Sequence, residues 1–68
     1  MLRLKHSLDA KGITVKGCAA LLGISEKSMS NKLAGRSDFL YREARKLKSI
    51  LPEYDVDYLL SDADAQHP

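Results

Sequence analysis

Residues 26–36, EKSMSNKLAGR, place hydrogen-bonding and cationic side chains along one face of an expected helix. On that face Lys27 can donate to O6 and N7 of guanine, and Asn31 can pair with N6 and N7 of adenine. Glu26 can accept a hydrogen bond from N4 of cytosine, or it can simply complement the positive end of the helix dipole. These residue types predict base-edge contacts in the major groove of DNA.

Other polar residues around this face are suited to phosphate groups. The start of a helix offers free backbone N–H groups, and Thr14 and Lys16 stand at such a start. Plain solvation would account equally well for any single lysine. The remaining candidates for phosphate contact, on or just past the second helix, are Ser28, Lys32 and Arg36.

The sequence predicts no catalytic site, metal site or disulfide. His6, Ser7 and Asp9 would lie on one helix, where neighbouring side chains diverge and form no catalytic triad. His6 and His67 are far apart, with no Cys or carboxylate at metal-ligand spacing. The single Cys18 excludes an internal disulfide and a cysteine-based zinc site, and we interpret it as a small buried apolar residue. We expect no enzyme activity, no metal and no cofactor.

Two short helices joined by a tight turn would position these side chains. Thr14 can cap a helix over residues 15–22, and Gly23 can end it in the left-handed conformation. The small residue at position 19 leaves room for a second helix to cross closely. The expected inner face of the first helix consists of Cys18, Ala19 and Leu22.

The second helix, over residues 26–34, would follow the turn directly. Ile24 is expected to point inward, and Ser25 is the expected cap. Met29 and Leu33 lie four residues apart and would form the buried face, which leaves the polar side chains outside. This is the layout of a helix-turn-helix, whose second helix enters a major groove.

Residues 14–36 resemble the helix-turn-helix of the Cro and phage-repressor (XRE-type) class of DNA-binding proteins. The ending SNKLAGR at 30–36 looks like the S-x-K-L-N-G-K ending common among phage repressors. KGIT at 11–14 and VDYLL at 56–60 also look like family segments and extend the resemblance over residues 2–61. The other matching positions are the small residue of the first helix, the turn glycine, the apolar residue after it and the buried residue of the second helix, namely Ala19, Gly23, Ile24 and Met29.

Three residues depart from the family's pattern. Val15 stands where many members carry a phosphate-contacting Gln. Gly17 lies inside the first helix at a cost of about 1 kcal/mol. Lys32 occupies a position that is apolar in much of the family, and Leu33 is expected to take over its role in the core.

The resemblance implies an all-α fold, a compact five-helix bundle of the lambda-repressor-like DNA-binding type. It also implies a sequence-specific transcriptional regulator of a phage or prophage, which binds double-stranded operator DNA. Because one such module buries a modest surface, we expect a symmetric homodimer on a pseudo-palindrome. The candidate interface residues are Phe39, Tyr58 and Leu59.

Two other functions fit the same residues. The motif could serve as a protein-interaction module of the antitoxin or anti-repressor type, which would show tight partner binding without salt-dependent affinity for DNA. It could also belong to a DNA-architectural accessory protein of a mobile element, which would bend DNA at several tandem sites.

Hydrophobic periodicity predicts three further helices. The first covers residues 2–11, with Leu4 and Leu8 on its inner face. The others cover 40–51, which Pro52 ends, and 56–60. The expected inner face of the helix over 40–51 consists of Leu40, Ala44, Leu47 and Leu51.

The caps and the end of the domain complete this prediction. Asp55 is the expected cap of the helix over 56–60, whereas Asp38 is a candidate cap two residues before Leu40. We expect residues 1–61 to form one DNA-binding domain and residues 62–68 to be a disordered acidic tail.

Positive charge is concentrated in the part of the chain that contains the motif. Residues 1–51 hold all 11 Lys and Arg against four Asp and Glu, a net charge of +7. Residues 52–68 hold five acids and no Lys or Arg. A basic body suits a polyanionic partner, and the acidic end is expected to point away from DNA. Chance clustering in a small charged domain is the alternative interpretation.

Composition limits the class of protein. The chain has 68 residues, of which 44% are hydrophobic, enough for one small domain with a helical core. No apolar run approaches the roughly 18 residues of a membrane span, and the N-terminal residues lack the apolar stretch of a signal peptide. We therefore expect a cytoplasmic protein without a membrane partner or a small-molecule ligand.

Overall fold

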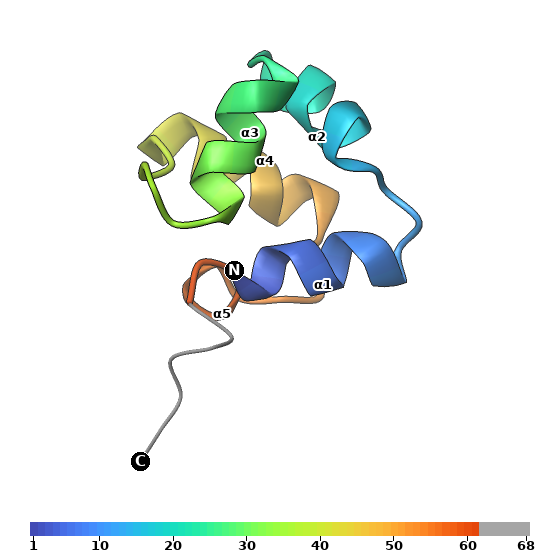
Figure 1. The fold of residues 1–68 in the computed structure, drawn as a ribbon. Helices are drawn as coiled ribbons and strands as arrows, with labels where there is room; N and C mark the ends of the chain where they lie inside the picture. The colour runs from blue at the N-terminus through green and yellow to red at the C-terminus, as the bar shows by residue number, and fades with distance from the viewer. Residues whose placement is uncertain (62–68) are drawn as a thin grey trace.

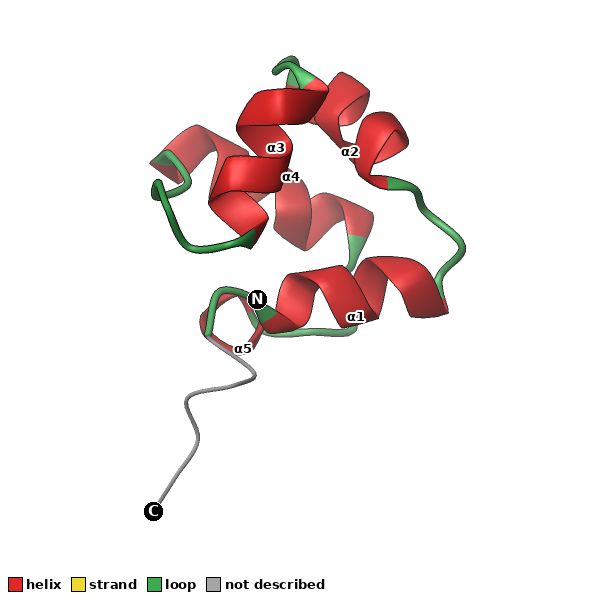
Figure 2. Ribbon diagram, in the orientation of Figure 1, coloured by secondary structure: helices red, strands yellow, loops and turns green. Residues whose placement is uncertain are grey.

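The computed structural model describes residues 1–61, which fold into five α-helices around one apolar core (Figure 1). The all-α prediction is confirmed, since residues 1–61 contain helices and loops and no β-strand (Figure 2). The predicted tail at 62–68 lies outside the described residues. The helices are α1 (Arg3–Ala10), α2 (Val15–Leu22), α3 (Glu26–Leu33), α4 (Tyr41–Ile50) and α5 (Val56–Leu59).

The helices form a compact arrangement in which α2 and α3 pack together above α1, and α5 lies beside the N-terminus (Figure 1). Backbone hydrogen bonds hold the first residues in place. The N–H of Leu2 donates to the Leu33 carbonyl at 2.8 Å, and the N–H of Arg3 donates to the Ser61 carbonyl at 2.9 Å. These two hydrogen bonds connect the beginning of the chain to the end of α3 and to the residues that follow α5.

Side chains from all five helices or their ends meet in the core. The inner face of α1 is the predicted one, and Leu59 of α5 reaches the same cluster. Half-buried apolar residues, Ile24 and Phe39 among them, pack against it. The buried apolar side chains are Leu4, Leu8, Cys18, Ala19, Leu22, Met29, Leu33, Leu47, Leu51 and Leu59.

The predicted inner face of α4 is wrong at its first position. Leu40 is 46% exposed, because it precedes the helix in an extended conformation and its side chain does not follow the helical period. Its place is taken by Glu43, which lies one turn before Leu47 and is buried. An acidic side chain thus enters the interior where only apolar ones are expected.

Of the two acidic cap candidates, Asp55 stands at the expected position before α5, whereas Asp38 does not stand at the start of α4. The residue directly before α4 is Leu40, whose N–H donates to the Glu43 carboxylate at 2.9 Å, so Asp38 does not cap the helix. Asp55 precedes α5 but makes no capping hydrogen bond with its side chain.

Candidate nucleic-acid interface

The two helices of the motif begin with hydroxyl caps from adjacent residues. Thr14 Oγ1 accepts from the N–H of Gly17 at 2.9 Å, and Ser25 Oγ accepts from the N–H of Ser28 at 3.0 Å. Gly17 itself lies against the first cap, since a Cβ at this position would stand 3.1 Å from Thr14 Oγ1. One N–H group at each helix start is therefore satisfied by a residue of the adjacent sequence.

The turn between α2 and α3 depends on a left-handed residue. Gly23 has φ +75°, a conformation that costs other residues about 1–2 kcal/mol. Past it, the N–H of Ile24 donates to the Ala19 carbonyl at 3.0 Å and closes the end of α2. Ala19 is buried at the helix crossing, and the half-buried Ile24 packs against the core. The direction of α3 is set by this short, closed turn.

The three predicted base-contacting residues share the outer side of α3. Glu26 and Lys27 are exposed and Asn31 is half-exposed, whereas Met29 and Leu33 face the core. Lys27 makes no ion pair within residues 1–61. The outer side thus offers a cation, an amide and a carboxylate to a partner.

Arg36 contacts Asn31 through both its backbone and its side chain. The N–H of Arg36 donates to the Asn31 backbone carbonyl at 2.9 Å, just after Gly35 with φ +84°. The Arg36 guanidinium also donates to Asn31 Oδ1 at 3.3 Å. The residue predicted to contact phosphate is therefore held against a residue predicted to contact a base.

The other predicted phosphate contacts lie at helix starts. Thr14 and Lys16 are exposed at the beginning of α2, and Lys16 has no ion pair within the part of the chain that the structure describes. Ser28 is half-buried in the first turn of α3, where its N–H is taken by the cap. Free N–H groups of a helix start and a nearby cation suit an anion.

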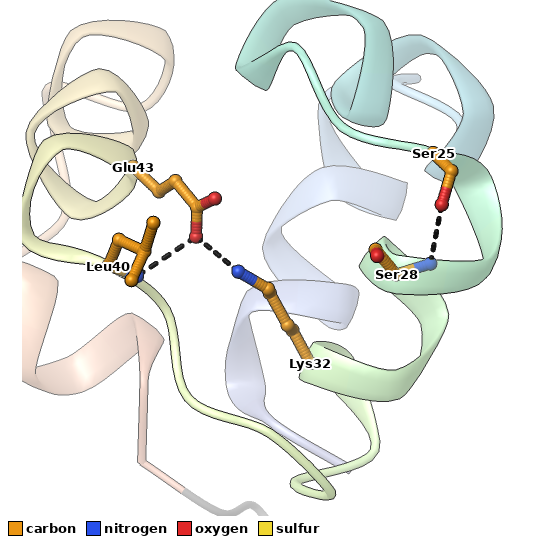
Figure 3. A network of polar contacts seen from close by, with 5 residues as sticks. All are labelled: Ser25, Ser28, Lys32, Leu40 and Glu43. Atoms are coloured by element: carbon orange, nitrogen blue, oxygen red, sulfur yellow. Dashed lines mark hydrogen bonds and ion pairs between the residues drawn. The ribbon is translucent and has the colours of Figure 1, made fainter.

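Lys32 requires a correction, because its ammonium group is not on the outer surface. It pairs with the Glu43 carboxylate at 2.5 Å, and the two side chains are only 12% and 4% exposed. Figure 3 shows Lys32 reaching from α3 toward Glu43 of α4, whose carboxylate also accepts from the N–H of Leu40. The Lys32 ammonium further lies 5.6 Å from the centre of the Phe39 ring. A phosphate contact from Lys32 would break this network.

The buried carboxyl of Glu43 is held in its charged form. Burial alone would raise its pKa, but the hydrogen bonds from Lys32 and Leu40 and the charges of Lys32 and Arg42 outweigh burial. The pKa of Glu43 consequently lies below its ordinary value of 4.5. The signal for this pair was present in the sequence: a lysine at an apolar position of the motif, and an acid on the same helical face as Leu47.

The candidate dimer contacts fall into two groups. Leu59 is fully buried inside the domain, so the structure removes it from the surface. Tyr58 is 49% exposed; its ring stacks on Tyr54 at 5.9 Å between centroids, and the Arg3 guanidinium lies 5.3 Å from its centre. Phe39 is half-buried beside the exposed Leu40.

The remaining reactive groups are placed as follows. Cys18 is buried, and burial raises the pKa of its thiol. Within residues 1–61, no three His, Cys, Asp or Glu side chains gather as they would around a metal ion. The same residues contain no helix with the length and apolarity needed to cross a membrane.

Comparison with known proteins finds no relative: no protein-family model, no curated protein and no solved structure matches this chain.

Proposed function

We propose that this protein is a sequence-specific DNA-binding transcriptional regulator of the Cro or phage-repressor type, with a lambda-repressor-like fold. The observation that carries the proposal is the outer side of α3. Polar side chains suited to base edges lie together on a helix whose start, crossing and turn are fixed by Ser25, Ala19 and Gly23. Such a helix can enter a major groove while α2 crosses the backbone.

In the proposed complex, different residues supply the specificity for a DNA sequence and the affinity for the phosphate backbone. Lys27 and Asn31 donate to or pair with base edges, and Glu26 selects cytosine or repels unsuitable sites. The start of α2, with Thr14 and Lys16, and the guanidinium of Arg36 bind phosphates and fix the register. The contact between Arg36 and Asn31 would link the two tasks at the end of α3.

We further propose that two copies bind one operator as a symmetric dimer. The surface that supports this lies at the loop before α4 and at α5, where Leu40 and Tyr58 are about half exposed. A hollow of about 260 Å³ opens nearby, and Leu2, Phe39 and Leu60 are among the residues that line it. Leu59 has no part in this interface because it is buried.

The first test is selection of bound duplexes from a random DNA pool at near-physiological salt, followed by sequencing. An enriched motif with two-fold symmetry is expected, and its half-site spacing would report the dimer geometry. A folded protein that enriches no sequence would contradict the proposal and favour the protein-interaction alternative.

Point variants test the assignment of α3 on the selected site. Lys27→Ala and Asn31→Ala should each lose about 1–3 kcal/mol of binding free energy on the selected site and little on random DNA. Arg36→Ala should weaken both and reduce the salt dependence. Lys5→Ala on α1 is the matched control, since its ammonium pairs with Asp9 away from the motif. Equal losses on both DNAs for all variants would remove the recognition role of α3.

A further inference from the structure

The exposed side of α4 carries a cluster of cations that the proposed function does not use. Arg42, Arg45 and Lys46 are exposed and, with Ser49, line a shallow hollow of about 300 Å³. Arg42 is spaced three and four residues from the other two cations, so the three share one helical face. The hollow thus has a cationic rim and a hydroxyl group.

None of these cations forms an ion pair with an acid among residues 1–61, although the charge of Arg42 acts on Glu43 at longer range. Lys5, Lys11 and Lys32 each form an ion pair, but none of the three α4 cations does. The guanidinium of Arg45 lies 5.9 Å from the centre of the Tyr41 ring, which is itself 79% exposed. Like charges at these spacings repel and destabilise an isolated helix, whereas a polyanion would relieve the repulsion.

The side of α4 that carries Arg45 turns away from Lys32 of α3. Lys32 and Glu43 mark the sides on which the two helices face each other (Figure 3). Because each residue turns the helix by about 100°, Arg42, Arg45 and Lys46 lie about 100°, 160° and 60° from Glu43 around α4. The basic face is therefore a flank of α4 that turns away from Lys32 most fully at Arg45. By the same measure Lys27 lies about 140° from Lys32 around α3. The side of α3 that carries Lys27 and the side of α4 that carries Arg45 therefore point away from each other.

We propose that the basic face of α4 binds the phosphate backbone of a second segment of duplex DNA. One folded unit would then hold two segments, one read by α3 and one bound without sequence preference by Arg42, Arg45 and Lys46. This inference rests on the proposed function, because it takes the segment on α3 as given. The cluster supplies charge and a hydroxyl group, which recognise phosphate but carry no code for bases.

A bridging assay tests the proposal. A selected duplex is fixed to beads, and the capture of a free fluorescent duplex of unrelated sequence is measured as protein is added at about 50 mM salt. The double variant Arg45→Gln/Lys46→Gln should retain binding to the fixed duplex and lose at least tenfold in capture of the free one. Glutamine is a good helix former at both exposed positions, and unfolding curves verify the fold.

The matched control is Lys5→Gln/Lys11→Gln, which removes the same net charge from ion-paired lysines outside α4. It should bridge like the unmodified protein, and only the α4 variant should lower the salt slope of bridging, by about 1.8 for two phosphate contacts. Equal bridging by both double variants, or binding to one duplex without any bridging, would overturn this inference and leave the proposed function intact. Failure of the unmodified protein to bind any single duplex would overturn both.

Discussion

The helices of the motif and the helix that follows them begin in different ways. α2 and α3 are capped by Thr14 and Ser25, residues that directly precede them, so their starts are determined locally. α4 has no such cap; the carboxylate of Glu43 accepts from the N–H of Leu40 and at the same time binds Lys32 of α3. The motif is therefore defined by short-range contacts, whereas the position of α4 depends on a buried ion pair.

The largest expected effect comes from removing the acid of this pair. Glu43→Ala would leave the Lys32 ammonium buried without a charge partner and the start of α4 without its cap. The free energy of unfolding should fall by about 3–5 kcal/mol, measured by urea denaturation. Because domains are commonly stable by only about 5–15 kcal/mol, this loss would remove a large fraction of the stability.

The double variant Lys32→Met/Glu43→Leu sharpens this result. Apolar side chains of similar volume often replace a buried pair without loss, so this variant should recover most of the stability that Glu43→Ala loses. A double variant as unstable as Glu43→Ala would show that the pair contributes something other than balanced charge.

The local part of the comparison is tested at the helix crossing. Ala19→Leu would add volume where α2 and α3 meet and should destabilise the fold by about 1–3 kcal/mol. Ala20→Leu is the matched control, since the neighbouring residue is exposed. Full stability of Ala19→Leu would contradict the close crossing that the structure shows.

Smaller effects are expected at the hydroxyl caps. Thr14→Ala and Ser25→Ala should each cost about 1 kcal/mol, because each removes one acceptor from a helix start. Ser30→Ala, at an exposed position of α3, serves as the control in the same denaturation series. A cost at Ser25 as large as that of Glu43→Ala would remove the distinction between the two kinds of helix start.

The stability of the protein should depend on pH through the ion pair of Lys32 and Glu43. Since the pKa of Glu43 is lowered in the folded protein, its stabilising contribution is complete above about pH 4.5 and is lost as the pH falls through the folded value. Stability measured at falling pH should therefore decline below pH 4.5, and Glu43→Gln should flatten the decline. Glu53→Gln is the comparison variant: the hydrogen bond from Lys11 lowers the pKa of Glu53 too, but on the surface, where it stabilises less.

The same difference explains how much of the structure could be predicted from the sequence. Thr14, Gly23 and Ser25 act on their neighbours, so the bounds of α2 were predicted to the residue and those of α3 to within one. Apolar spacing likewise placed α1 and α5. These features depend on residues that are close together in the sequence, so the sequence alone is enough to predict them.

What could not be predicted depends on contacts distant in sequence. Lys32 and Glu43 are eleven residues apart, and although each is an unusual charge on an apolar face, neither position identifies the other as its partner. Leu40 matched the apolar period of α4, yet it stands outside the helix because the carboxylate of Glu43 fixes where the helix begins. In the candidate site, the same pair moved Lys32 from the phosphate-contacting set into the interior, while the outer residues of α3 lie on the predicted face.

The burial of Cys18 gives the motif an internal reporter of its own opening. This thiol is the only one in the chain, lies in α2 against the core, and has a raised pKa, so a disulfide reagent reacts with it only after α2 separates from its neighbours. Its labelling rate under native conditions, divided by the rate in urea, measures the free energy of that local opening without any added probe. DNA bound as proposed would slow the labelling in proportion to its affinity, so the labelling rate of Cys18 would also report binding.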